Sequence, residues 1–158
     1  MEPVLAADLE LALQLADLAD ELTLRSFRSP HDVVLKYDGT PVSTADLDVE
    51  RAIVERLRDE RPGDEVLCEE GGLLGARDGS GRRWVIDPLD HTRHFLRGNP
   101  DFATLIGLTV EGVCTVGVTS APAQERRWHA VLGYGAYTDG KRALRISAWW
   151  RGGRDGGE

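Results

Sequence analysis

The sequence predicts an α+β fold in which two N-terminal helices pack on a mostly antiparallel sheet. Apolar residues recur at helical spacing over roughly the first 60 residues. After residue 64 the chain breaks into short β-rich runs that are separated by turn signals. With 158 residues, of which 41% are hydrophobic, the chain is long enough to form one domain with its own core.

A stripe of leucines at spacings of four and three predicts a first helix over residues 4–27. The stripe consists of Leu11, Leu15, Leu18 and Leu22. Ser29-Pro30 is expected to end this helix, because proline does not continue a helical hydrogen-bond ladder. Residues 33–35 then read as a short extended piece, and Asp38-Gly39 marks a turn.

A second helix is expected to begin after Ser43, where Asp46 stands three residues on in the pattern of a capping box. Three apolar residues at spacing four continue it to about Glu60, namely Val49, Ile53 and Leu57. Pro62-Gly63 then terminates the helix.

The rest of the chain reads as strands. We expect strands over residues 66–68 and 84–86, joined by a glycine-rich connector over residues 71–81, with the second strand ending at Asp87-Pro88. Two β-rich runs around Glu111-Gly112 predict a hairpin, and three more short strands follow. These later strands are expected over residues 104–109, 113–119, 128–132, 136–138 and 143–147. Residues 1–147 should therefore form one domain, and residues 148–158 a disordered tail.

Composition narrows the function classes. The formal net charge of −8 disfavours binding to nucleic acid, although a cation could bridge the chain to a small phosphorylated substrate. No apolar run approaches the roughly 20 residues that a membrane span needs, and the N-terminus does not read as a secretory signal. The two cysteines, Cys68 and Cys114, indicate a reducing cytoplasm.

Three acidic groupings could carry chemistry. Glu69-Glu70 follows one apolar β-type run, Asp87 follows another with Asp90 three residues on, and Asp46 opens the second helix. Each has an ordinary structural interpretation, as a solvated face, a turn opener or a helix cap. Together they are harder to dismiss, because carboxylates that converge on one sheet edge need a compensating cation.

The residue types in this pattern favour Mg²⁺ over Zn²⁺, because carboxylates and carbonyls are hard oxygen ligands. The backbone carbonyl of Leu89 could add a further oxygen ligand. His91-Thr92 is expected to open a short helix whose free N–H groups could receive a phosphate.

Several ordered motifs resemble those of the inositol monophosphatase superfamily, and most of all its actinobacterial histidinol-phosphatase branch. They are the segments 84–95 (WVIDPLDHTRHF), 66–70 (VLCEE) and 36–46 (KYDGTPVSTAD), with Ser120-Ala121-Pro122 and residues 133–140 downstream. Arg126-Arg127-Trp128 and the nearby Pro-Ala pair point to the histidinol-phosphatase branch. The resemblance covers residues from about 9 to 147, in order and at family spacing.

The resemblance implies a set of metal ligands. Glu69 and Asp87 would bind a first Mg²⁺ together with the Leu89 carbonyl, and Asp87 and Asp90 would bind a second. Glu70 would hold a water molecule on the metal from the outer shell.

It also implies catalytic and phosphate-binding roles. Thr92, paired with Asp46, would help to deprotonate the attacking water, and the N–H groups of His91 and Thr92 would hold the phosphate. The implied activity is phosphomonoester hydrolysis, with histidinol phosphate preferred. Inositol monophosphate, a sugar bisphosphate and a 3′-phosphonucleotide are the alternative substrates.

The sequence departs from the family pattern at three places. His91 stands where the family has glycine beside the phosphate, His94 where it has Asn or Ala, and Cys68 where it has the glycine of Gly-Glu-Glu. We also expect the chain to lack the family's second domain and its further metal-binding Asp. A slow or inactive remnant, or an acidic binding module for a metal or a protein, is therefore the alternative function. Self-association, as a homodimer or through the surface that the second domain would cover, is the expected partner interaction.

Overall fold

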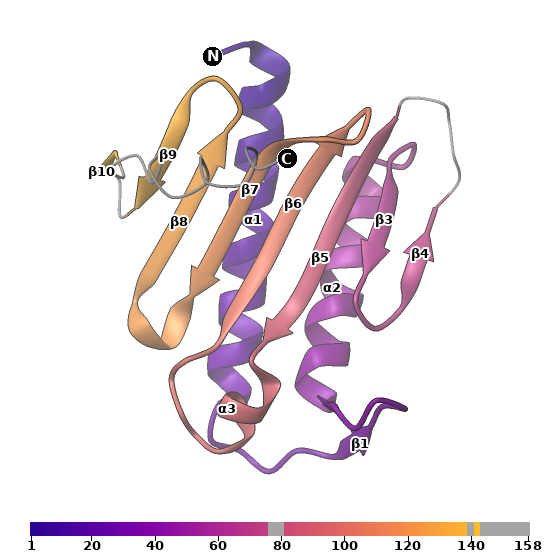
Figure 1. Ribbon diagram of the computed structural model, residues 1–158, viewed down its shortest axis with the longest axis vertical. Helices are drawn as coiled ribbons and strands as arrows, with labels where there is room; N and C mark the ends of the chain where they lie inside the picture. Colours follow the sequence, from indigo (N-terminus) through magenta and orange to yellow (C-terminus); the bar gives the residue numbers. More distant parts are fainter. Residues whose placement is uncertain (76–80, 139–140, 143–158) are drawn as a thin grey trace, which may run out of the picture.

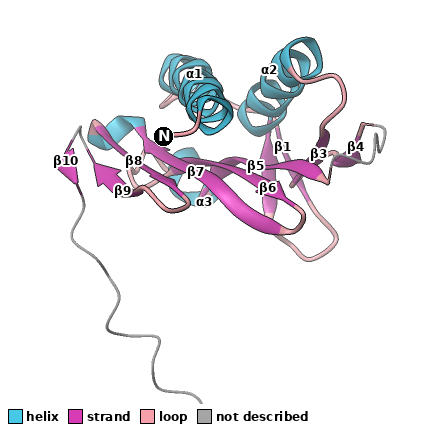
Figure 2. Cartoon of the chain, turned by 90° about the horizontal axis from the view of Figure 1, so that it is seen from above, coloured by secondary structure: helices cyan, strands magenta, loops and turns pink. Residues whose placement is uncertain are grey.

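The computed structural model describes residues 1–75, 81–138 and 141–142. Two long helices, α1 (Pro3–Ser26) and α2 (Thr44–Glu60), lie side by side on one face of an eight-stranded sheet (Figures 1 and 2). A short helix, α3 (Thr92–Leu96), lies at one end of the sheet. This arrangement confirms the α+β fold and both predicted helices.

The buried face of α1 differs from the predicted leucine stripe. Leu11 and Leu15 are fully buried, but Leu18 and Leu22 are only partly buried. Alanines complete the buried face, and Ala12, Ala16 and Ala19 are inaccessible to solvent. Small residues on this face let the helix backbone approach the sheet closely, so the larger leucines lie at its border.

A two-stranded hairpin connects the helices. It consists of β1 (Val33–Leu35) and β2 (Pro41–Ser43), which pair antiparallel. In the turn between them, the Asp38 carboxylate accepts hydrogen bonds from the backbone N–H and the hydroxyl of Thr40. The helix α2 follows β2 directly, and the backbone N–H of Ser43 donates to the Asp46 carboxylate at 2.7 Å, as the capping-box pattern predicts.

The large sheet has the strand order β10-β9-β8-β7-β6-β5-β3-β4. Its strands are β3 (Glu65–Cys68), β4 (Gly72–Leu74), β5 (Arg82–Asp90), β6 (Ala103–Val110), β7 (Val113–Ala121), β8 (Arg126–Val131), β9 (Gly135–Thr138) and β10 (Lys141–Arg142). A 3₁₀ turn, Pro122–Gln124, joins β7 to β8. All neighbouring strands pair antiparallel except β3 and β5, which run parallel.

On both sides of β3 the strands differ from the sequence prediction, and the short strands β2 and β10 are further differences. The edge strand β4 lies within residues 71–81, which were expected to be only a connector. The strand β5 does not end at Asp87-Pro88 but continues to Asp90 through an irregularity between Asp87 and Asp90. A proline is tolerated at such an irregularity, because no ladder hydrogen bond from its nitrogen is needed there. The strand predicted over residues 143–147 and the tail over 148–158 lie outside the described residues.

The core lies between the two helices and the sheet. Trp84 of β5 is at its centre with no exposed surface, and its indole N–H donates to Asp64 at 2.9 Å. Arg82 lies between Asp64 and Asp8 of α1, so an ion-pair network joins this helix to the sheet. Among the described helices, none has both the length and the apolar character that a membrane crossing requires.

Candidate metal and phosphate site

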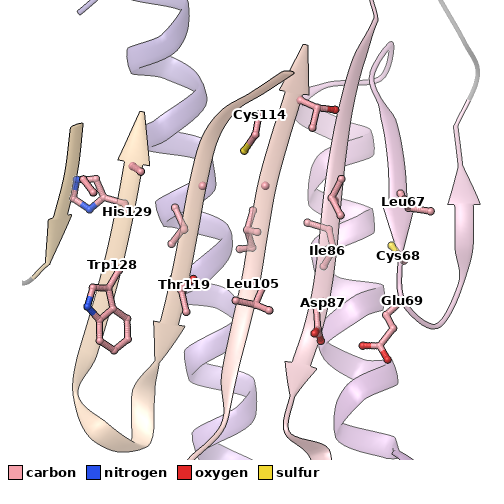
Figure 3. Close-up of a pocket in the computed structure, with 18 residues that line it drawn as sticks. Leu67, Cys68, Glu69, Ile86, Asp87, Leu105, Cys114, Thr119, Trp128 and His129 are labelled. Atoms are coloured by element: carbon pink, nitrogen blue, oxygen red, sulfur yellow. The ribbon is translucent and has the colours of Figure 1, made fainter. Parts of the chain in front are cut away.

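The parallel pair β3 and β5 places two of the predicted metal ligands side by side. The register of this pair sets Cys68 opposite Ile86, so the next residue of each segment is Glu69 or Asp87. The backbone N–H of Glu69 continues the ladder by donating to the Ile86 carbonyl at 3.1 Å. Figure 3 shows both carboxylates at the same end of the sheet. Parallel strands bring their carboxyl ends to one edge, and this produces the juxtaposition.

Asp87 is the carboxylate most perturbed by this arrangement. Burial raises its pKa to about 7, and the negative charge of Glu69, a hydrogen bond with Glu69 and the charge of Asp90 act in the same direction. The Leu89 N–H, which donates to Asp87 at 3.2 Å, opposes the shift only in part. The excess negative charge at this edge is what a bound cation would compensate.

Lys36 supplies positive charge to the neighbouring glutamates. Its ammonium lies 2.8 Å from a carboxylate oxygen of Glu69 and 2.5 Å from one of Glu70. Burial alone would lower the pKa of Lys36, but its hydrogen bonds and charge interactions with these two glutamates raise it. Lys36 belongs to the motif at residues 36–46, but the sequence alone does not predict its contact with these glutamates. Its position beside the Asp38-Gly39 turn was the available signal that it belongs to a loop over the site.

Glu70 is held from the opposite side by α2. Its backbone N–H donates to the Glu50 carboxylate at 2.9 Å, and Glu50 is buried. A Cβ at Gly71 would lie 2.7 Å from a carboxylate oxygen of Glu50, so a larger residue there would displace this side chain. Burial raises the pKa of Glu70, while Lys36 acts to lower it. The sequence did not single out Glu50, since it reads as one more charged residue of a helix.

Asp46 and Thr92 are brought into direct contact. The Thr92 hydroxyl lies 2.9 Å from one carboxylate oxygen of Asp46 and 3.0 Å from the Leu89 carbonyl. The other oxygen of Asp46 accepts from both the N–H and the hydroxyl of Ser43. Asp46 is almost completely buried, so its orientation is set by these partners.

A polar cavity of about 360 Å³ collects most of the predicted residues. Those that line it are Glu69, Asp87, Leu89, Asp90, His91 and Thr92. Asp46 and Glu70 are not among the lining residues, but Asp46 contacts Thr92 and Glu70 contacts Lys36, which both line the cavity. Arg93 also borders the cavity and donates to the Gly39 carbonyl at 3.0 Å, which ties the loop carrying Lys36 to α3.

His91 occupies a backbone conformation that favours glycine. Its φ of +66° lies in the left-handed region, where a side chain is strained. Its ring Nδ1 lies 3.2 Å from the Asp101 carbonyl, so the exposed imidazole turns toward that residue.

The chain is similar in sequence to known proteins over most of its length. The sequence model of the inositol monophosphatase family matches residues 1–148. A histidinol-phosphatase of Mycobacterium tuberculosis is 49% identical over 143 residues, which are 89% of this chain and 54% of that protein. A Streptomyces griseus protein named glucose-1-phosphate thymidylyltransferase is 46% identical over 84% of this chain and 51% of its own length.

The fold matches solved structures as well. The crystal structure of the extragenic suppressor protein SuhB from Bartonella henselae superposes with a TM-score of 0.84 at 33% identity. The match covers 90% of this chain and 55% of that one. The chain thus spans about half the length of the relatives that it matches.

Proposed function

The chain belongs to the inositol monophosphatase family, and on that premise we propose that it is a Mg²⁺-dependent phosphomonoesterase. The observation that carries the proposal is the placement of Glu69 beside Asp87 at one sheet edge, where burial and charge raise the Asp87 pKa to about 7. Relatives with this domain include an enzyme named histidinol-phosphatase, so hydrolysis of a small phosphorylated metabolite is the class of reaction.

The donor set fits Mg²⁺. Glu69, Asp87 and Asp90 offer carboxylate oxygens and Leu89 a carbonyl, all at the rim of the same polar cavity. The ligand atoms of these three carboxylates lie farther apart than those of the closest group of potential metal ligands among the described residues. One of the three, Glu69, also pairs with Lys36 at 2.8 Å. Bound Mg²⁺ would supply Lewis-acid stabilisation of the charge that develops on the phosphoryl oxygens.

Side chains of this protein can accept the proton of the attacking water. Thr92 can accept a proton from an attacking water at its hydroxyl oxygen while it donates its own proton to Asp46. Asp46 is suited to this role, because it is fixed by Ser43 and points one oxygen at Thr92. Glu70 would orient the water, and the N–H groups of His91 and Thr92 would bind the phosphate.

Histidinol phosphate is the proposed substrate. The proposal rests on the Mycobacterium tuberculosis relative and on the Arg126-Arg127-Trp128 segment. This segment resembles the histidinol-phosphatase branch, and it is not among the residues that line the polar cavity. Arg127 pairs with Asp17 and Asp20 of α1. The guanidinium of Arg126 stacks over Trp128 at 4.7 Å.

Two further points belong to this proposal. The thiols of Cys68 and Cys114 are both free, which suits a reducing compartment and hence a cytoplasmic location. The alternative function is a catalytically impaired chain that binds a metal or a protein without turnover, and assays of binding and turnover separate the two.

The test measures inorganic phosphate release from histidinol phosphate, inositol monophosphate and glucose 1-phosphate, with and without Mg²⁺. We expect release that requires Mg²⁺ and is greatest for histidinol phosphate. Asp87→Asn should abolish it and weaken Mg²⁺ binding about tenfold or more. Asp48→Asn, at an exposed carboxylate paired with Arg51, is the matched control and should change neither. Mg²⁺ binding without phosphate release would support the alternative.

A further inference from the structure

A second group of potential metal ligands lies beside the carboxylate site. It consists of His91, His94 and Asp101, whose ligand atoms all lie within 4.8 Å of one another. Within residues 1–75, 81–138 and 141–142, no other set of His, Cys, Asp and Glu is this tight. We propose that these three residues bind one Zn²⁺-class ion, at a site distinct from that of Glu69 and Asp87.

The ligand types select this class of ion. Two imidazoles and one carboxylate are typical of Zn²⁺ and its first-row neighbours, whereas Mg²⁺ prefers oxygen ligands alone. The two neighbouring sites would therefore differ in chemistry, and an excess of Mg²⁺ should leave the imidazole site available.

The spacing of the atoms supports the proposal. The Nδ1 atoms of His91 and His94 lie 3.2 and 3.1 Å from the Asp101 carbonyl oxygen, and His94 Nδ1 lies 3.4 Å from an Asp101 carboxylate oxygen. Two ligands of a tetrahedral ion with bonds of about 2.0–2.1 Å lie about 3.3 Å apart. The separation between His94 Nδ1 and the Asp101 carboxylate is thus already that of two ligands of one ion, and the contacts with the Asp101 carbonyl hold both imidazoles beside this residue.

The loop that carries Asp101 is held against α3. The Asn99 N–H donates to the His94 carbonyl at 3.0 Å, and the Asn99 side chain accepts from the Asp101 N–H at 3.1 Å. From the far side, the Gln124 amide donates to an Asp101 carboxylate oxygen at 3.2 Å. Such outer contacts orient ligands before the ion arrives.

The backbone at His91 is a further observation. A non-glycine residue at φ +66° is strained, and such strain persists where the surroundings hold it. The ring centroids of His91 and His94 lie 4.9 Å apart, so this backbone conformation is found where the two imidazoles are neighbours. Both histidines also line the 360 Å³ cavity, so an ion held here would face the proposed phosphate position.

The test is a calorimetric titration of the chain with Zn²⁺ in excess Mg²⁺, together with the visible spectrum of the Co²⁺-substituted protein. We expect one Zn²⁺ per chain and Co²⁺ bands that report imidazole ligation. His94→Ala and Asp101→Asn should each weaken Zn²⁺ binding about tenfold or more. His91→Asn should do the same, and it keeps a residue that tolerates the left-handed backbone. Far-UV circular dichroism checks that each variant is folded.

Two controls locate the ion. His129→Ala removes a histidine of β8 that is outside the cluster and should leave Zn²⁺ affinity unchanged. Asp87→Asn should likewise leave the Zn²⁺ titration and the Co²⁺ spectrum unchanged. The proposal is overturned if no Zn²⁺ binds in excess Mg²⁺, if all three cluster variants bind like the parent, or if Asp87→Asn abolishes binding. Because the readouts are binding and spectra, failure of the phosphatase proposal would leave this result intact.

Discussion

At the scale of single residues, the surroundings of each carboxylate decide its behaviour. Asp38 lies in an exposed turn, and hydrogen bonds from the side chain and backbone of Thr40 lower its pKa. Asp87 has the same side chain, but burial and the nearby Glu69 raise its pKa to about 7. The contrast follows from whether donors or other acids surround the group.

Thr92 offers a sharp test of the proton path. Thr92→Val keeps the shape of the side chain but removes the hydroxyl that joins Asp46 to the cavity. We expect kcat for phosphomonoester hydrolysis to fall about 100-fold or more, because general-base assistance is lost. Thr92→Ser keeps the hydroxyl and should retain most of the rate. Equal losses in both variants, measured by phosphate release under saturating Mg²⁺, would contradict this role.

His129 should make stability depend on pH. Burial lowers its pKa below the ordinary value of 6.5, and the charge of Arg127 adds to the effect. As the pH falls through 6.5, the unfolded chain takes up this proton before the folded one does, so stability is lost until the pH reaches the folded pKa. Above 6.5 the residue is neutral in both states and contributes nothing.

The measurement is urea unfolding of the parent and of His129→Gln between pH 5 and 8. The free energy of unfolding should fall less steeply below pH 6.5 in the variant, while the difference between the two proteins stays constant from pH 7 upward. Parallel curves across the whole range would show that His129 does not titrate differently on folding.

At the scale of elements, ionic contacts link segments that are far apart in sequence. Arg82 of β5 donates to Asp8 of α1 at 2.9 Å and to Asp64, before β3, at 3.0 Å. Both carboxylates are largely buried. The network therefore fixes how α1 lies on the sheet, and removing its cation leaves two buried charges with fewer partners.

Arg82→Met should therefore lower the free energy of unfolding by about 3 kcal/mol, the lower end of the range for breaking a buried ion pair. The matched control is Arg83→Met in the next residue. Arg83 pairs with Glu65 at 2.7 Å. Glu65 is buried as well, but the Arg83 side chain is about a third exposed and that of Arg82 only 19% exposed, so the loss should be smaller for Arg83. Denaturant unfolding of both variants measures the difference. Similar losses would mean that the deeper burial of the Arg82 side chain has no special weight.

At the scale of the whole molecule, the sheet has two unlike faces. One is covered by α1 and α2, and the other carries an open groove of about 860 Å³ (Figure 3). Apolar side chains of neighbouring strands line this groove, among them Leu67, Leu105 and Trp128. Exposed apolar surface of this kind favours association between protein molecules.

We expect a protein of these 158 residues to self-associate through this face, since pairing two copies removes apolar surface from water. Sedimentation velocity should show a sedimentation coefficient that rises with concentration. Val85→Lys, within the groove, should reduce the rise. Val113→Lys, at an exposed valine outside the groove, is the matched control and should leave it unchanged. A coefficient independent of concentration in the parent would contradict the prediction.

The sequence by itself determined the elements whose cause is local. Apolar spacing identified both long helices, and Ser43 with Asp46 marked the start of α2. The Glu111-Gly112 turn identified the hairpin of β6 and β7. Such signals lie within a few residues of one another along the chain. The motifs around Glu69 and Asp87 also indicate the family, and the match of the family model to residues 1–148 confirms it.

Only the tertiary structure decided what depends on residues distant in sequence. The parallel register of β3 and β5 sets Glu69 beside Asp87, and no local signal specifies which strands pair. The edge strand β4 pairs with β3, although it lies within residues 71–75, of which three are glycines. Lys36, Glu50 and the cluster of His91, His94 and Asp101 gain their neighbours in the same way. The local sequence pattern determines whether a segment becomes a helix, a strand or a turn. Burial, charge compensation and strand pairing determine which residues of other elements it contacts.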